Sequence, residues 1–229
     1  MNKENNFLTT IHNNLIVSCQ ALEDEPLHGS HIMAKMAQAA KEGGAIAIRS
    51  NSASDVSAIK EQTGLPIIGL IKRDYPDSEI FITATLKEVK ELLEVKPDVI
   101  ALDATVRQRP NGEKLKDLVD FIHEHSDTLV MADIATVEDA TYAIACQVDM
   151  ISTTLSGYTA DSPKLEGPDF ELVQRLVKNS TVPVIAEGRV QTPEQARRML
   201  EMGAWSVVVG SAITRPQLIT KSFAEGIKA

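Results

Sequence analysis

Two stretches near the carboxyl end of the chain decide the fold, Val182-Pro-Val-Ile-Ala-Glu-Gly-Arg189 and Gly203-Ala-Trp-Ser-Val-Val-Val-Gly-Ser-Ala212. Each contains an apolar run typical of a buried parallel strand, and each run leads into a glycine. Between them, Thr192-Pro-Glu-Gln-Ala places proline at the first position of a helix. Two such neighbouring strands let their glycine loops turn backbone N–H groups onto one anion. The pattern predicts a phosphate site after strands seven and eight of a (β/α)₈ barrel.

The rest of the chain supplies the six further strand-helix units that such a barrel needs, because short apolar runs alternate with amphipathic stretches. The predicted strands are Leu15–Ser18, Ala45–Ile48, Pro66–Leu70, Val99–Leu102, Leu129–Ala132, Met150–Ser152, Val184–Ala186 and Ser206–Val209. Long polar segments follow the third and sixth strands, on the face where barrel enzymes carry their chemistry. We expect one α/β TIM-barrel domain over residues 1–229, with residues 1–12 as a polar N-terminal extension.

Composition restricts the partners of this domain. The chain has 229 residues, a formal charge of −9 and a pI near 5.1. An acidic protein repels nucleic acid and anionic membranes, so we expect neither as a partner. The sequence shows no secretory or membrane-spanning segment, which favours a cytoplasmic location. We expect Cys19 and Cys146 to be buried, reduced thiols and, because the histidines lack metal-ligand spacing, no metal site.

Several predicted strands lead into a polar side chain, which is informative because a parallel strand is buried on both faces. These side chains are Gln20, Arg49, Lys72, Asp103, Asp133 and Glu187, after strands one to five and seven. In a closed barrel the strand ends form a ring, so the six residues are predicted to gather as one polar constellation.

Each of these residues also has an ordinary structural interpretation. Lys72 could be a solvated loop lysine, and Asp133 could cap the following helix. Arg49 could form an ion pair with a neighbouring carboxylate, Gln20 could be a hydrogen-bonded amide at the barrel mouth, and Asp103 could begin a turn. We favour a functional role most strongly for Lys72, and for Glu187, which precedes a predicted phosphate-loop glycine.

The glycines are more specific as a pair than singly. Gly188 and Gly210 each follow one of two adjacent predicted strands, and Ser211 comes directly after the second glycine. The two glycine loops are predicted to bind phosphate. Arg215 is expected within reach of the same anion and could supply positive charge, although it could also be a surface arginine. Arg189, which follows Gly188, is included among the predicted substrate-binding residues.

A lysine and a glutamate around a phosphate-anchored small molecule suit proton abstraction next to a carbonyl carbon. Burial in the barrel mouth lowers the pKa of a lysine, so that Lys72 can act as a base near neutral pH. Glu187 can then move the proton of a substrate hydroxyl.

At this point the motifs resemble a known family, the N-acetylmannosamine-6-phosphate 2-epimerases of bacterial sialic-acid catabolism. The motifs are Glu25-Pro-Leu, Lys41-Glu-Gly-Gly-Ala-Ile-Ala-Ile-Arg-Ser-Asn51, Ile71-Lys-Arg-Asp-Tyr75, Ala132-Asp-Ile-Ala-Thr136, Leu155-Ser-Gly-Tyr-Thr159 and Ala186-Glu-Gly-Arg189. The resemblance runs from about Ser18 to Pro216, and its most specific parts are Ile-Lys-Arg-Asp-Tyr and Ala-Glu-Gly-Arg. The polar extension lies outside it and has no assigned role.

The resemblance implies inversion at C2 of N-acetylmannosamine 6-phosphate to give N-acetylglucosamine 6-phosphate, without a cofactor or metal. Lys72 matches the family's base and Glu187 its acid. Other positions are implied to hold the substrate: Gln20, Arg49 and Asp133 the sugar and its N-acetyl group, and Gly188, Gly210, Ser211 and Arg215 the phosphate. The expected partner is this amino-sugar phosphate, and the sequence leaves a homodimer open.

Three alternatives remain at this stage. An FMN-dependent barrel shares the two-glycine phosphate site and would be yellow when purified. A pentose-phosphate epimerase would normally place metal-binding histidines at strand ends, where this sequence has none. A non-catalytic sugar-phosphate sensor would keep the phosphate site and lose the chemistry, which the presence of both Lys72 and Glu187 argues against.

Overall fold

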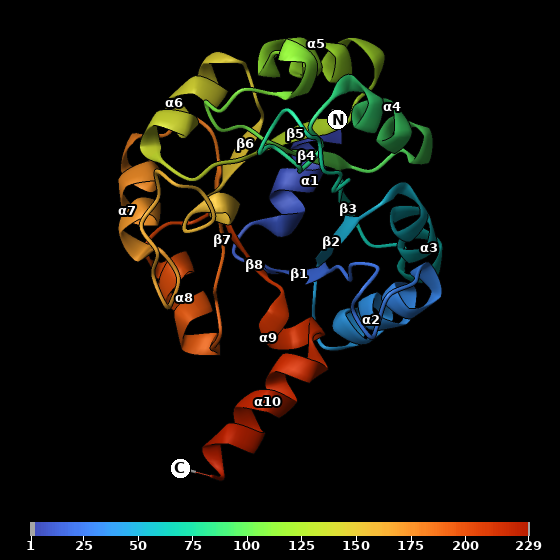
Figure 1. The fold of residues 1–229 in the computed structure, drawn as a ribbon, viewed down its shortest axis with the longest axis vertical. Coiled ribbons are helices and arrows are strands. Elements are labelled where there is room, and N and C mark those ends of the chain that lie inside the picture. The colour runs from blue at the N-terminus through green and yellow to red at the C-terminus, as the bar shows by residue number, and fades with distance from the viewer. Residues whose placement is uncertain (1–2, 229) are drawn as a thin grey trace.

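The computed structural model describes residues 3–228 and forms a closed barrel of eight parallel strands in chain order (Figure 1). The strands are β1 (Leu15–Cys19), β2 (Ala47–Asn51), β3 (Ile67–Leu70), β4 (Val99–Asp103), β5 (Leu129–Asp133), β6 (Met150–Ser152), β7 (Val184–Glu187) and β8 (Ser206–Val209). The barrel closes where β8 pairs with β1, with Leu15 opposite Val207. The predicted (β/α)₈ TIM barrel is thereby confirmed.

Helices surround the barrel and supply its return connections (Figure 1). They are α1 (Lys3–Ile11), α2 (Ser30–Glu42), α3 (Ala53–Thr63), α4 (Leu86–Val95), α5 (Leu115–His125), α6 (Val137–Ala145), α7 (Phe170–Asn179), α8 (Pro193–Glu201), α9 (Ser211–Thr214) and α10 (Pro216–Gly226). Thr85, Thr136 and Thr192 each begin a helix with a capping box, and Pro193 holds the predicted first helical position of α8. Such caps satisfy N–H groups that a helix start leaves without partners.

Strand β2 begins two residues later than the sequence predicted. Gly44, with φ of 102°, and Ala45, whose N–H donates to the carbonyl of Ala40, form the turn that follows α2. The strand instead continues to Asn51, so Arg49 lies inside it rather than after it. Strands β4, β5 and β7 likewise include their terminal carboxylates, which places these side chains on the barrel wall.

Alternation along each strand divides the barrel into an apolar interior and a polar mouth. Inward-facing apolar side chains fill the lower interior: Ile16, Ala47, Ile68, Ala101, Met131, Met150, Ile185 and Val208. Two residues further along their strands, Arg49, Asp103 and Asp133 face the same axis, because successive side chains point to opposite sides. Asp133 stands in register with Asp103 and Ser152. The polar constellation therefore lies at the carboxyl ends of the strands.

Helix α1 closes the opposite end of the barrel, although the sequence assigned residues 1–12 no role. Phe7 and Ile11 are buried against the first residues of the strands, and α1 is seen through the centre of the barrel (Figure 1). Trp205 Nε1 also donates to the carbonyl of Leu8 at 2.8 Å. Among the described residues, no helix is long and apolar enough to cross a membrane.

Both cysteines are buried and unpaired, as the sequence predicted. Cys19 ends β1 on the outward side, and burial raises the pKa of its thiol to about 12. Neither cysteine lines the cavity at the barrel mouth. Their role is packing.

Candidate active site

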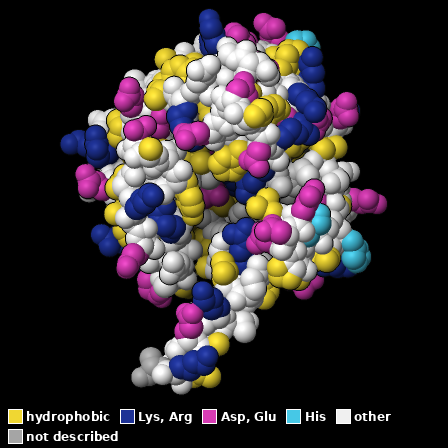
Figure 2. Space-filling view, viewed as in Figure 1, with side chains coloured by type: hydrophobic (Ala, Val, Ile, Leu, Met, Phe, Trp, Pro, Cys, Tyr) yellow, Lys and Arg dark blue, Asp and Glu magenta, His cyan; other side chains and the backbone are white. Residues whose placement is uncertain are grey.

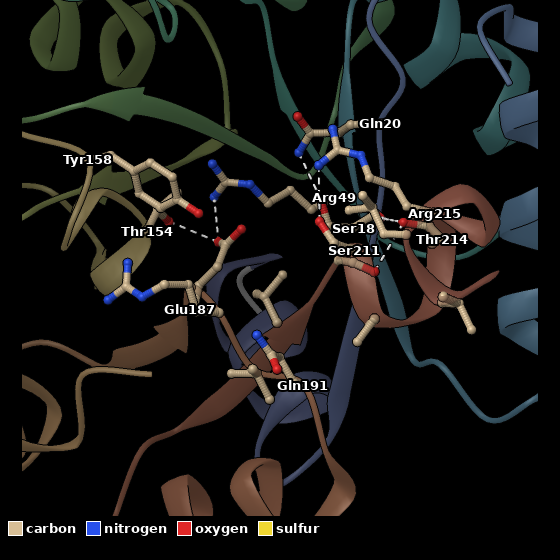
Figure 3. Close-up of a pocket in the computed structure, with 18 of the residues that line it drawn as sticks. Ser18, Gln20, Arg49, Thr154, Tyr158, Glu187, Gln191, Ser211, Thr214 and Arg215 are labelled. Atoms are coloured by element: carbon tan, nitrogen blue, oxygen red, sulfur yellow. Dashed lines mark hydrogen bonds and ion pairs between the residues drawn. The ribbon is translucent and has the colours of Figure 1, made fainter. Parts of the chain in front are cut away.

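A cavity of about 680 Å³ opens at the carboxyl ends of the strands and contains most of the predicted site. Figure 2 shows it as a hollow at the centre of this face, and Figure 3 shows side chains converging on it. The predicted residues that line it are Gln20, Arg49, Lys72, Glu187, Gly188, Arg189, Gly210, Ser211 and Arg215. Asp133 does not reach the cavity wall.

Arg49 ties two carboxylates together beneath the cavity. Its NH1 and NH2 bind Asp133 Oδ1 and Oδ2 at 3.0 and 2.6 Å, and NH1 lies 3.1 Å from Glu187 Oε2. Arg49 is 1% exposed and Asp133 is fully buried, so each needs the other's charge. The alternative interpretation of Arg49 as an ion-pair partner is confirmed, and Asp133 supports Arg49 from below. A direct substrate contact of Asp133 remains a prediction.

Glu187 is positioned through both its backbone and its side chain. Thr153 Oγ1 accepts from the N–H of Glu187 at 3.0 Å and donates to its carbonyl at 2.8 Å. Thr154 Oγ1 lies 2.9 Å from Oε2 (Figure 3). Burial, with the neighbouring charge of Asp133, raises the pKa of Glu187, and Arg49 opposes this rise only in part. A raised pKa is what a proton donor at neutral pH requires.

Lys72 follows β3 on the predicted long connection. Its N–H donates to Asn51 Oδ1 at 2.8 Å, and its backbone bridges to Ile82 on the returning part of the loop. Burial, and then the positive charges of Arg49 and Arg215, lower the pKa of Lys72 to about 8. No hydrogen bond or ion pair involving its Nζ is formed with the described residues, so the amine is available to a substrate.

The specific motif Ile71-Lys-Arg-Asp-Tyr75 fixes the loop that carries this lysine. Arg73 binds the carboxylates of Glu88 and Glu91 on α4, and Tyr75 donates its hydroxyl proton to Glu88 Oε1 at 2.7 Å. Glu88 is completely buried and also caps α4. The two motif side chains therefore hold the loop against α4, away from the cavity. The sequence did not indicate Glu88, because a glutamate that only caps a helix and one that also binds a neighbouring loop have the same sequence pattern.

Gln20 faces the cavity above β1. Its Nε2 donates to Ser18 Oγ at 2.9 Å, while its buried Oε1 has no hydrogen-bond partner among the described residues. A buried amide oxygen without a partner costs free energy unless a ligand donates to it. This observation favours the predicted binding role over that of a satisfied structural amide.

The two glycine loops lie side by side at the predicted phosphate position. Gly188 has φ of 109°, a conformation that favours glycine, and a Cβ at Gly210 would lie 3.3 Å from Cβ of Ser18. Arg215 NH1 donates to Ser211 Oγ at 3.0 Å, while its Nε and NH2 bind both oxygens of Glu25. Arg215 thus lines the cavity as a paired cation, and Glu25 from the family motif is its partner.

Arg189 is placed differently from the other predicted substrate-binding residues. Its guanidinium donates to the carbonyls of Gly167 and Ser156, and it lies 5.6 Å from the ring centre of Tyr158. These groups belong to the β6–α7 connection, so Arg189 holds that connection over the cavity. The structure brings Arg189 to the cavity edge with two of its five N–H donors bound to backbone carbonyls.

Asp103 completes the set of predicted residues, whereas Thr154 is a site residue that was not predicted. Asp103 accepts from the N–H and hydroxyl of Thr105 and binds Arg107, which confirms its interpretation as the start of a turn. Thr154 lines the cavity and contacts two carboxylates, yet the sequence did not indicate it. A threonine after a strand carries no charge signal, so only the folded barrel identifies it.

Comparison with known proteins places this geometry in context. The chain matches the model of the family described as "Putative N-acetylmannosamine-6-phosphate epimerase" over residues 33–229. A relative from Clostridium perfringens is 58% identical across 96% of this chain and 100% of its own length. One from Clostridioides difficile is 56% identical, with coverages of 96% and 99%. Both relatives are described in the same terms, as 2-epimerases.

Solved structures agree with these sequence matches. The structure of the N-acetylmannosamine-6-phosphate 2-epimerase from Clostridium perfringens superposes with a TM-score of 0.94 at 57% identity, covering 95% of each chain. A thiamine phosphate pyrophosphorylase from Pyrococcus furiosus gives a TM-score of 0.62 at 17% identity, over 90% of this chain and 89% of that one. The second likeness shows the fold alone.

Proposed function

Because the chain belongs to the N-acetylmannosamine-6-phosphate epimerase family, as its motifs predicted, we propose that it inverts C2 of N-acetylmannosamine 6-phosphate. The product is N-acetylglucosamine 6-phosphate. The single observation that carries the proposal is the pair Lys72 and Glu187 in one cavity, a lysine whose pKa is lowered and a glutamate whose pKa is raised. These two pKa shifts bring a base and an acid into the same pH range.

The proposed reaction starts from the open-chain sugar, in which C2 lies next to the C1 carbonyl. Lys72 takes the C2 proton, and the electron pair of the broken C–H bond moves toward the carbonyl oxygen. Glu187 supplies a proton to that oxygen, so that no full negative charge develops in the buried site. Return of the proton to the opposite face of C2 gives the epimer and restores both groups.

Binding is proposed to use the rest of the cavity wall. The loops of Gly188 and Gly210 hold the phosphate with backbone N–H groups, and the Arg215 side chain adds charge and positions Ser211. The unpartnered oxygen of Gln20 accepts from the substrate, at the sugar or its N-acetyl group.

Two measurements test this function. The first adds N-acetylmannosamine 6-phosphate and follows N-acetylglucosamine 6-phosphate with a coupled assay; absence of product rejects the proposal. The second follows exchange of C2 hydrogen with deuterated water, using a substrate analogue locked open-chain. Glu187→Gln should retain exchange, whereas Lys72→Ala should lose it. If Lys72→Ala retains exchange and Glu187→Gln loses it, Glu187 removes the C2 proton and the proposed roles are reversed.

A homodimer is proposed as the working assembly, supported by α10. This helix projects from the barrel (Figure 1), and none of its residues is buried. Leu218, Phe223 and Ile227 are 48%, 74% and 85% exposed, an apolar surface that a second copy of the chain would cover. Light scattering should give twice the chain mass of 24.9 kDa, and Phe223→Asp should halve it. Lys221→Ser, a polar position on the same helix, serves as the control.

The proposed compartment is the cytoplasm. Cys19 and Cys146 are unpaired although both are buried in stable elements, which suits a reducing compartment. A fusion to a fluorescent protein would show the location directly, and a signal confined to the cell envelope would reject it.

A further inference from the structure

Thr154, the second residue of the 3₁₀ helix η2 (Thr153–Leu155), touches more polar groups than one hydroxyl proton can serve. Its Oγ1 lies 2.8 Å from Asp133 Oδ1 and 2.9 Å from Glu187 Oε2. Ser152 Oγ is a third neighbour at 2.9 Å. Figure 3 shows Thr154 pointing at the carboxyl group of Glu187. The hydroxyl therefore stands between two carboxyl groups that come from β5 and β7.

Counting protons limits how these contacts can be made. A threonine hydroxyl donates one hydrogen bond and accepts two. If both carboxyl groups were ionised, Thr154 could donate to only one of them, and its oxygen would face a second negative oxygen without a proton between. If one carboxyl is neutral, all three contacts are satisfied: Thr154 donates to the ionised group and accepts from the neutral group and from Ser152.

The surrounding charges decide which carboxyl carries the proton. Asp133 receives both arms of Arg49, at 3.0 and 2.6 Å, which stabilises its ionised form. Glu187 receives only one Arg49 nitrogen, at 3.1 Å. Ser152 Oγ adds only a long contact to the same oxygen, at 3.4 Å. The negative charge of Asp133 favours the neutral form of Glu187, and Lys72 Nζ forms no ion pair with it in the described part of the chain. Glu187 is therefore the better place for the proton.

We propose that Thr154 is a positioning residue that keeps Glu187 protonated in the resting protein, in the order Glu187 Oε2–H to Thr154 Oγ1 and Thr154 Oγ1–H to Asp133 Oδ1. The inference rests on the proposed function for its consequence, because a neutral Glu187 is ready to act as an acid. Its Oε1 carries no hydrogen bond to the described residues and is open to a substrate oxygen.

The same arrangement bears on Lys72. A negative Glu187 would stabilise the ammonium form of Lys72, whereas a neutral Glu187 removes that stabilisation. The site holds one proton that either group could carry. By favouring its place on Glu187, Thr154 lowers the pKa of Lys72 and enlarges the fraction of Lys72 that is present as the free amine before substrate binds.

The test follows the side-chain carboxyl carbon of Glu187 by NMR in full-length protein labelled with ¹³C at the glutamate carboxyl carbon. Loss of one resonance in Glu187→Gln assigns the signal. At neutral pH the wild type should show the shift of a neutral acid. Thr154→Val, which removes the hydroxyl at similar size, should lower the pKa of Glu187 by about one unit, a tenfold change in the ratio of its two forms.

Two further variants separate this role from a structural one. Thr154→Ser keeps the hydroxyl and should restore the wild-type titration. Thr141→Val makes the same change at an exposed hydroxyl on α6, away from Glu187, and should leave Glu187 neutral. In Thr154→Val the acidic limb of kcat/KM should move to higher pH, because the shared proton then stays on Lys72. A merely structural role would change the amount of active protein and not the position of this limb.

The opposite sign overturns the proposal. If Thr154 donates to an ionised Glu187, Thr154→Val raises the pKa of Glu187, as does the apolar valine itself. A wild-type resonance at the position of an ordinary carboxylate also rejects it. Because the NMR signal does not depend on turnover, a wild-type protein without epimerase activity would reject the proposed function and leave the proton assignment standing.

Discussion

The lowered pKa of Lys72 predicts the pH dependence of the reaction. Its pKa is reduced from an ordinary 10.5 to about 8 by burial, by Arg49 and by Arg215. At pH 7 the neutral fraction of an ordinary lysine is about 0.03%, and that of a lysine with a pKa of about 8 is about 9%. Placement in the barrel mouth thus increases the free base about 300-fold. Since only the neutral amine accepts a proton, kcat/KM should fall as pH drops through the pKa of Lys72.

We expect the acidic limb at or below pH about 8, with a loss of roughly tenfold per pH unit beneath it. The coupled assay over a pH series with constant ionic strength measures this limb. Titration of the substrate phosphate occurs near pH 6, about two units lower, and is separable from it. Lys72→Arg keeps a positive charge that cannot be removed in this range and should be inactive at every pH.

If kcat/KM continues to rise through pH 10, Lys72 titrates as an exposed lysine does, and the electrostatic argument is wrong. A flat profile from pH 6 to pH 9, with retained activity in Lys72→Arg, would assign proton abstraction to another group.

Three further outcomes are expected. Lys72→Ala should retain phosphate-dependent substrate binding but lose turnover by roughly a hundredfold or more, measured by calorimetry and the coupled assay. Gly210→Asp should abolish sugar-phosphate binding with little change in circular dichroism, because it adds bulk beside Ser18 and negative charge to the phosphate site. Asp133→Ala should destabilise the fold by about 3–5 kcal/mol in denaturant titrations, because it leaves buried Arg49 without its two-pronged partner; Asp161→Ala, at an exposed turn carboxylate, is the control.

The sequence was sufficient for the barrel because its signals are local. Apolar runs, capping threonines and loop glycines act within one strand-helix unit, and eight such units admit few arrangements. The strand ends were located to within three residues, and Lys72, Glu187 and the two predicted phosphate-loop glycines were placed together, as they are around one cavity. Their shared location follows from topology, since every parallel strand of a barrel ends at the same face.

Pairings across the barrel could not be predicted in the same way. Arg49 and Asp133 are 84 residues apart, and their ion pair depends on the closed geometry of the sheet. Glu25 and Arg215 join the two ends of the chain over a separation of 190 residues. Helix α1 looked like a polar extension because its three apolar residues, Phe7, Leu8 and Ile11, stand among polar ones. Each of these contacts is set by the shape of the barrel as a whole and has no local sequence signal.

These pairings explain why Lys72 is available as a base near neutral pH. Arg49 and Arg215 are each bound to a carboxylate, which fixes their guanidinium groups in place and keeps both charged. Lys72 lies near both arginines without such a partner among the described residues, so their fields act against its protonation. Arginine suits this role because it does not release its proton in a protein. The two paired arginines therefore supply more than binding contacts: together with burial, they lower the pKa of Lys72.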